Sequence, residues 1–157
     1  MSVKTLNDLM DIAIQEEIRS QKLYLDAKAK TTDKQICDFF SSLAKQEKTH
    51  EKVLKSVKEM EIFDGSITID AEVLKRTELS HSITDESLIQ DQTLDEIFQI
   101  ALKREKKAYT LYDEMAESSR NEEVKLLFNN LANEERIHHK NIEKTYMAQS
   151  GQMGYEG

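Results

Sequence analysis

Six residues of this sequence form two copies of one pattern, in which a single glutamate is followed 30 residues later by a Glu-x-x-His motif. The first copy is Glu17, Glu47 and His50, and the second is Glu105, Glu135 and His138. On a helix, residues three positions apart lie on one face, so each motif can direct a carboxylate and an imidazole at one ion. One such motif could occur by chance, but the complete duplicated set predicts a metal centre.

Charge arithmetic indicates how many ions this centre holds. The six residues are flanked by Leu, Ala, Phe, Ile and Tyr, which indicates a buried helix face. A buried, unpaired carboxylate costs several kcal/mol, so four of them would unfold a domain whose stability is about 5–15 kcal/mol. Four carboxylates and two divalent cations give a neutral site with neutral imidazoles. The alternative is interior ion pairing with protonated histidines, whose two positive charges cannot balance four negative ones.

The chemistry of the donor atoms narrows the choice of metal. Two single glutamates and two Glu-x-x-His motifs from four helices are the ligand set of ferritin-like di-iron and di-manganese bundles. Oxygen-rich ligands with one nitrogen per metal favour iron or manganese, although zinc binds many such sites. We therefore expect two iron ions, with manganese or zinc as alternatives.

Two tyrosines follow the single glutamates at a fixed distance. Tyr24 and Tyr112 each stand seven residues, about two helical turns, after Glu17 and Glu105. Two interpretations are open for them. They are either amphipathic aromatic residues of the core or phenols that donate hydrogen bonds to metal-bound carboxylates.

The elements that must position these residues also repeat. Aligning residues 5–58 with 93–146 without a gap gives thirteen identities in 54 positions, far more than chance, which indicates two copies of one helical hairpin. Apolar residues at steps of three and four predict helices at 6–30, 33–61, 94–117 and 121–147. Each helix follows a capping signature. The four pairs are Thr5 and Asp8, Thr32 and Gln35, Thr93 and Glu96, and Ser119 and Glu122.

These elements predict an all-α, antiparallel four-helix bundle with a long crossover between its second and third helices. The crossover spans 62–92, where we expect a short helix at Asp70–Lys75 or Asp85–Ile89. One domain is expected over 1–148, followed by a flexible tail at 149–157 that contains three glycines.

Composition and charge argue against several classes of partner. The 157 residues include no proline and carry a formal net charge of −8, which disfavours nucleic acid and anionic membrane surfaces. No apolar run approaches the length of a membrane span or a signal peptide. Cys37 is the single cysteine, so a disulfide or Cys-x-x-Cys pair within the chain is excluded and the reducing cytoplasm is the expected compartment.

The repeated pattern resembles the di-iron domain of rubrerythrins. The resemblance rests on Glu17-x6-Tyr24 with Leu43-Ala44-x-x-Glu47-x-x-His50, and on Glu105-x6-Tyr112 with Leu131-Ala132-x-x-Glu135-x-x-His138, and it covers residues 5–146. It implies a ferritin-like fold, a homodimer, and reduction of hydrogen peroxide to water as a defence against oxidative stress. It also implies that Glu47 and Glu135 bridge the metals, with Glu17, Glu105, His50 and His138 as terminal ligands.

Two features depart from that family. Rubrerythrins proper carry a four-cysteine iron site, whereas these residues include only Cys37, so the resemblance implies a rubredoxin-like electron donor in trans. They also carry an extra glutamate where this chain has Ala108, with Ser20 at the equivalent position of the first repeat.

Three functions stay open from the sequence. The leading hypothesis is a di-iron oxidoreductase that reduces hydrogen peroxide or dioxygen. The second is a ferroxidase or iron-handling protein, for which Fe(II) is the substrate. The third is a non-enzymatic interaction module that the metals hold together, and its structural site would be closed to exogenous ligands.

Overall fold

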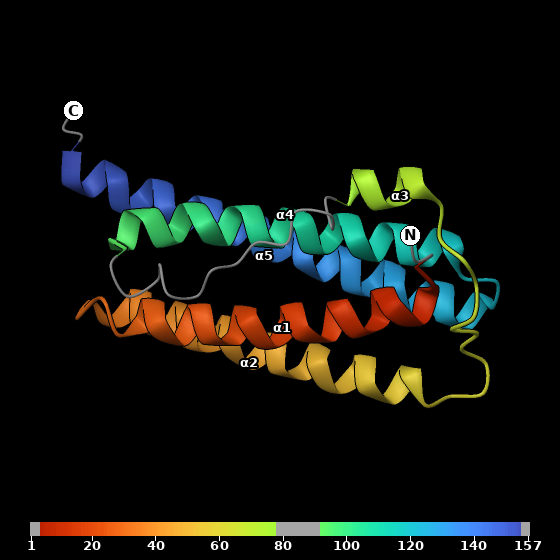
Figure 1. Cartoon of the computed structure of the whole chain (residues 1–157). Coiled ribbons are helices and arrows are strands. Elements are labelled where there is room, and N and C mark those ends of the chain that lie inside the picture. The colour runs from red at the N-terminus through yellow and green to blue at the C-terminus, as the bar shows by residue number, and fades with distance from the viewer. Residues whose placement is uncertain (1–3, 78–91, 155–157) are drawn as a thin grey trace.

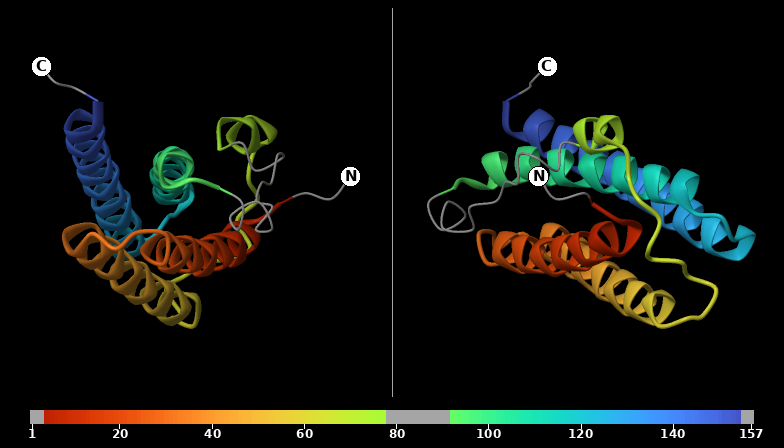
Figure 2. Two further views of the ribbon diagram at one scale, coloured as in Figure 1. Left: turned by 90° about the vertical axis from the view of Figure 1, so that its left-hand side faces the viewer. Right: turned by 45° about the vertical axis from the view of Figure 1, so that its right-hand side comes forward.

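The computed structural model describes residues 4–77 and 92–154, and it is a bundle of four long helices (Figure 1). The helices are α1 (Leu6–Lys28), α2 (Lys34–Lys58), the short α3 (Ala71–Arg76), α4 (Leu94–Ser118) and α5 (Glu122–Gly154). Hairpin α1–α2 packs against hairpin α4–α5, and α2 and α4 run in the same direction (Figures 1 and 2). A parallel α2 and α4 require a connection along the length of the bundle, so the predicted all-α bundle with a long crossover is confirmed.

Side-chain caps define where the long helices begin. Capping boxes at Thr5 and Thr93 begin α1 and α4, as predicted. The other two predicted caps are wrong. Asp33, and not Thr32, caps α2 by accepting a hydrogen bond from the Ile36 amide. The side chain of Asn121 caps α5, accepting from the amides of Glu123 and Val124 at 2.8 and 3.2 Å.

Ser119 has a different role from the predicted one. It ends α4, and its hydroxyl donates to the Met115 carbonyl at 2.8 Å. The true caps, Asp33 and Asn121, are equivalent positions of the two repeats, 88 residues apart. Both are short acceptors of the kind that helix N-termini prefer.

The first part of the crossover packs against the beginning of α1. Thr68 forms an isolated antiparallel bridge with Thr5, and the Leu6 amide donates to the Ile67 carbonyl at 2.7 Å. Gly65 lies so close to this helix that an added Cβ would be 2.8 Å from the Cβ of Asn7, so only glycine fits there.

The crossover helix α3 agrees with the expectation of a helix at Asp70–Lys75, displaced by one residue. It lies beside α4 (Figures 1 and 2), to which Arg76 is joined by two hydrogen bonds to the Glu114 carboxylate, at 2.8 and 3.2 Å. The alternative at Asp85–Ile89 lies outside the described residues. At the other end of the chain, α5 continues to Gly154, past the predicted end at 147 and into the segment expected to be a flexible tail.

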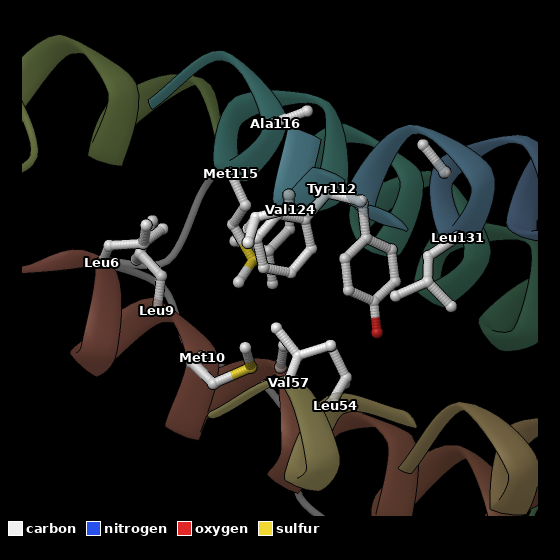
Figure 3. Close-up of a cluster of buried hydrophobic side chains, with 14 of the residues drawn as sticks. Leu6, Leu9, Met10, Leu54, Val57, Tyr112, Met115, Ala116, Val124 and Leu131 are labelled. Atoms are coloured by element: carbon white, nitrogen blue, oxygen red, sulfur yellow. The ribbon is translucent and has the colours of Figure 1, made fainter. Parts of the chain in front are cut away.

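The apolar core is divided into two clusters. One, shown in part in Figure 3, contains Leu6, Leu9 and Met10 of α1 with Met115 of α4. The other gathers residues near the opposite ends of the helices, and its members include Leu23, Phe40, Phe98 and Ile142. On each long helix, the one or two predicted ligands of that helix lie between residues of the first cluster and residues of the second. The bundle therefore contains a polar layer between two apolar ones.

Candidate metal centre

The polar layer brings all six predicted ligand residues together. Each long helix contributes from its middle: α1 and α4 give one glutamate each, and α2 and α5 give a Glu-x-x-His motif each. None of the six residues is more than 3% exposed. They are Glu17, Glu47, His50, Glu105, Glu135 and His138.

Their donor atoms form two overlapping groups. Glu17 and His50 belong to one group, and Glu105 and His138 belong to the other, while Glu47 and Glu135 belong to both. Within each group the donor atoms lie within 4.8 Å of one another. Two carboxylates shared between two such groups have the arrangement that bridging ligands require.

The distances around the histidines show how closely the groups overlap. His50 Nδ1 lies 3.3 Å from Glu47 Oε1 and 3.5 Å from Glu135 Oε1. His138 Nδ1 lies 3.3 and 2.9 Å from the same two oxygens. The two imidazole rings stack with their centroids 5.6 Å apart.

Whether this layer suits metal ions can be judged from its buried polar atoms that lack a hydrogen-bond partner. Among the described residues, eight buried side-chain polar atoms have no hydrogen-bond partner, and seven of them belong to the six ligand residues. Most buried polar atoms in proteins are hydrogen-bonded, so a convergent set of unpartnered ones needs an explanation. Ion pairing alone leaves Glu135 Oε2 without a partner, whereas two divalent cations would engage oxygen and nitrogen donors of this kind. The residues therefore fit a dinuclear metal site.

Two residues that the sequence analysis missed hold the outer nitrogens of the histidines. His50 Nε2 lies 2.7 Å from Glu134 Oε1, and His138 Nε2 lies 2.5 Å from Gln46 Oε1. The Gln46 amide nitrogen donates to Ser42 Oγ at 3.1 Å, which leaves its oxygen for the histidine. Because both partners accept, Nε2 of each neutral ring carries the proton. The Nδ1 lone pair then faces the glutamates, as metal ligation requires.

A signal for this pair existed in the sequence. Gln46 and Glu134 each precede the motif glutamate by one residue, and they occupy equivalent positions of the two repeats. Both are hydrogen-bond acceptors. They were missed because they are exposed, polar and not identical, and such residues usually face solvent.

The two tyrosines join the ligands across the hairpins. The Tyr24 hydroxyl, on α1, donates to Glu105 Oε2 on α4, and the Tyr112 hydroxyl, on α4, donates to Glu17 Oε2 on α1, the latter at 2.5 Å. Both rings are buried, and Figure 3 shows the Tyr112 hydroxyl pointing from α4 towards the α1–α2 hairpin. Burial and the neighbouring carboxylates raise the pKa of both phenols well above 10. Both tyrosines therefore donate hydrogen bonds to candidate ligands.

Burial dominates the acidity of three of the four carboxyl groups. It raises the pKa of Glu17 to about 8, with the charge of Glu47 acting in the same direction. Burial also raises the pKa of Glu105 and, much further, that of Glu135. Glu47 differs: burial would raise its pKa, but the imidazoles on either side lower it to about 2.

The pKa of both ligand histidines is raised, which favours their protonated form. Burial would lower their pKa, but the neighbouring glutamates outweigh it and raise the pKa of His50 to about 11 and that of His138 to about 9. Without metal the layer therefore holds several protons, which metal ligands must release when an ion binds.

A cavity of about 330 Å³ between α1 and α4 connects the surface with the ligands. Its lining includes the exposed residues Asp11 and Gln15 and the buried carboxylates Glu17 and Glu135. The cavity could admit a small reactant to the metal centre. A closed structural site would lack such a route.

Small side chains and two ion pairs, Arg19–Glu16 and Arg104–Glu16, contribute to the lining of this cavity. Ser20 and Ala108, the residues that depart from the rubrerythrin pattern, both contribute to the lining. The Arg104 guanidinium donates to Glu16 Oε1 at 3.1 Å and to Ser20 Oγ at 3.2 Å. Glu16 and Arg104 are equivalent residues of the two repeats, so here the repeats meet as an ion pair.

Comparisons with known proteins agree with this geometry. The rubrerythrin family model matches residues 1–58 and 60–154. A crystal structure of a Thermotoga maritima protein, described as a ferritin-like diiron-carboxylate protein, aligns with a TM-score of 0.80 and 18% identity, covering 94% of this chain and 97% of the other. The ferritin-like fold predicted from the sequence is thereby confirmed. A search of curated proteins gave no match. Among the described residues, none of the helices combines the length and hydrophobicity that crossing a membrane requires.

Proposed function

The chain belongs to the rubrerythrin family, and from this premise we propose that it is a dinuclear non-haem iron oxidoreductase that reduces hydrogen peroxide, or dioxygen, with electrons from an external donor. In the peroxide reaction, one H₂O₂ takes up two electrons and two protons, its O–O bond breaks, and two water molecules form. Two bound iron ions would supply the electron pair and Lewis acidity.

The observation that carries the proposal is the pair of overlapping donor groups next to a cavity. Six protein ligands for two ions leave coordination positions for exogenous oxygen ligands. The cavity between α1 and α4 is lined by Glu17, which belongs to one donor group, and by Glu135, which belongs to both. A reactant that arrives by this route would meet both metal positions.

The chain's own residues have separable tasks in this proposal. Glu47 and Glu135 belong to both donor groups and would hold the two ions next to each other. Tyr24 and Tyr112 fix the terminal carboxylates through their hydroxyl protons. Because the pKa of each phenol is raised, both tyrosines keep these protons at neutral pH.

Three further expectations accompany the proposal. Cys37 is the single cysteine among the 157 residues of the sequence, so they cannot form a four-cysteine iron site. This supports a rubredoxin-like donor in trans. The same cysteine usage favours the reducing cytoplasm. The resemblance to rubrerythrins supports a homodimer.

Iron content and stoichiometry test the proposal together. Protein loaded anaerobically with two Fe(II) per chain should consume about one H₂O₂ per chain in a rapid absorbance change, because each turnover takes two electrons. The iron should stay bound after gel filtration, and a reductant protein should restore the activity. Glu135→Ala, which removes a shared ligand, serves as the control without a dinuclear site.

Each alternative predicts a different result. Release of Fe(III) after each oxidation, with further Fe(II) consumed, would identify Fe(II) as the substrate of an iron-handling protein. Two firmly bound ions that react with neither peroxide nor dioxygen would instead identify a structural role for the metals. Either result would overturn the peroxidase proposal.

A further inference from the structure

The side-chain hydrogen bonds that the ligand residues make are alike in the two halves of the metal centre except at one pair. His50 Nε2 faces a carboxylate, Glu134 Oε1, while His138 Nε2 faces an amide, Gln46 Oε1. The two acceptors, Gln46 and Glu134, occupy equivalent positions of the two repeats. One half of the centre therefore has a charged partner where the other half has a neutral one.

The remaining direct side-chain partners of the ligands are matched. Tyr112 donates to Glu17 in one half, and Tyr24 donates to Glu105 in the other. On the cavity side, Glu16 forms ion pairs with Arg104 at 3.1 Å and with Arg19 at 2.7 Å, and among the described residues none of these three side chains bonds to a ligand side chain. Among the direct contacts of the ligands, the two halves therefore differ in the acceptor behind each histidine.

An acceptor behind a ligating histidine changes its strength as a metal ligand. A carboxylate that accepts the outer N–H pulls on this proton and increases electron density at the other ring nitrogen, which makes the imidazole a more basic ligand. An amide oxygen accepts a weaker, neutral hydrogen bond. The Gln46 amide is also held in place by Ser42, so it fixes its histidine without adding charge.

We propose that Glu134 makes the half with Glu17 and His50 the stronger metal site, so that the two ions bind in order, with this half filled first. Glu134 is thus a positioning and tuning residue that acts through His50 and does not touch the metal. The inference rests on the metal-binding part of the proposed function, and it is independent of the reaction that the loaded centre performs.

The expected size of the effect follows from the exposure of Glu134. Removing a partner of this kind typically weakens metal binding by about 10–100-fold. The Glu134 side chain is 56% exposed, and water screens its charge, so we expect the lower end, about tenfold.

Stepwise titration with Co(II), followed by absorption and calorimetry, tests the order of binding. The wild type should bind two ions with unequal affinities. Glu134→Gln should weaken the first step about tenfold and bring the two affinities together, while Gln46→Glu should bring them together by strengthening the second. Glu143→Gln removes one charge from an exposed position of the same helix and should leave both steps unchanged.

Backgrounds that lack one histidine show which half each residue affects. In His138→Ala, Glu134→Gln should weaken the remaining site, while Gln46→Glu should have no effect. In His50→Ala, Gln46→Glu should strengthen the remaining site, while Glu134→Gln should have no effect. A purely structural role of Glu134 would weaken binding equally in both backgrounds and would overturn the inference. Equal affinities in the wild type would overturn it while leaving the dinuclear site intact, whereas failure to bind two ions would contradict the proposed function itself.

Discussion

The tyrosine hydrogen bonds offer a direct test of the metal centre, because removing one hydroxyl should weaken metal binding more than it weakens the fold. Tyr112→Phe deletes the hydroxyl that donates to Glu17 Oε2 at 2.5 Å. The ring remains, so packing in the apolar layer is preserved. Tyr24→Phe makes the equivalent change at Glu105.

The size of the loss in metal affinity depends on whether the Glu17 carboxyl group, which accepts the hydrogen bond, is charged. Without metal at neutral pH, the carboxyl group of Glu17 is mostly protonated, because burial raises its pKa to about 8. Loss of a hydrogen bond to a neutral group costs about 0.5–1.5 kcal/mol. Metal binding removes the proton, and a hydrogen bond to a charged group contributes about 1.5–3 kcal/mol. The difference, about 1–1.5 kcal/mol, corresponds to metal binding that is about five- to tenfold weaker.

Two measurements separate the loss of stability of the fold from the loss of metal affinity. Thermal unfolding of metal-free Tyr112→Phe should show a decrease of a few degrees, since about 1 kcal/mol shifts the melting temperature of a chain of this size by about 2–4 °C. Chelator competition with Mn(II) should show the larger loss of affinity. The matched control is Tyr146→Phe, which removes a hydroxyl that donates to Asp95 Oδ1 at 2.6 Å on the surface. If the Tyr146 variant lost as much metal affinity as the Tyr112 variant, or if the latter lost none, the reasoning would be refuted.

Three further predictions concern protons, stoichiometry and access. Metal-free protein should melt at a higher temperature near pH 5.5 than near pH 8.5, because Glu17 and His50, with pKa raised to about 8 and about 11, bind more protons folded than unfolded. This stabilisation is complete below the unfolded pKa and is lost as the pH rises through the folded pKa; an unchanged pH dependence in Glu17→Gln would contradict this origin. Anaerobic metal analysis of Glu135→Ala should show both ions weakened, and clean loss of one ion would exclude a shared ligand. Ala108→Leu should narrow the cavity and slow azide binding to the oxidised protein, unlike Ala148→Leu at an exposed position.

The ligand residues could be predicted because charge in a buried helix face is costly and therefore conspicuous. Glu17 and Glu105 interrupt apolar stripes at the same place in both repeats, and no ordinary core tolerates such residues. The helices could be predicted for a related reason, since an apolar period of 3.6 residues continues over more than twenty residues. The interrupted apolar stripe and the apolar period both reflect which residues are buried, and burial can be recognised from the pattern of apolar residues in the sequence.

The features that were missed involve exposed residues, for which the pattern carries little information. Thr32 and Asp33 are both good capping residues, and only the path of the backbone decides that Asp33 begins α2. Gln46 and Glu134 face solvent at one end and a histidine at the other, and a polar residue on an exposed face does not show whether it has a partner. The cavity beside Ala108 depends on the separation of two helices, which no local pattern determines.

The polar layer joins the two hairpins more specifically than the apolar clusters can. The hydrogen bonds of Tyr24, Tyr112, His50 and His138 to their side-chain partners all cross from one hairpin to the other. Each candidate metal group likewise takes three residues from one hairpin and a single glutamate from the other. Apolar contacts tolerate sliding and repacking, whereas these directed contacts fix one register of the repeats. Metal binding would stabilise this register by mass action, so the residues that form the metal centre would also specify how the duplicated hairpins assemble.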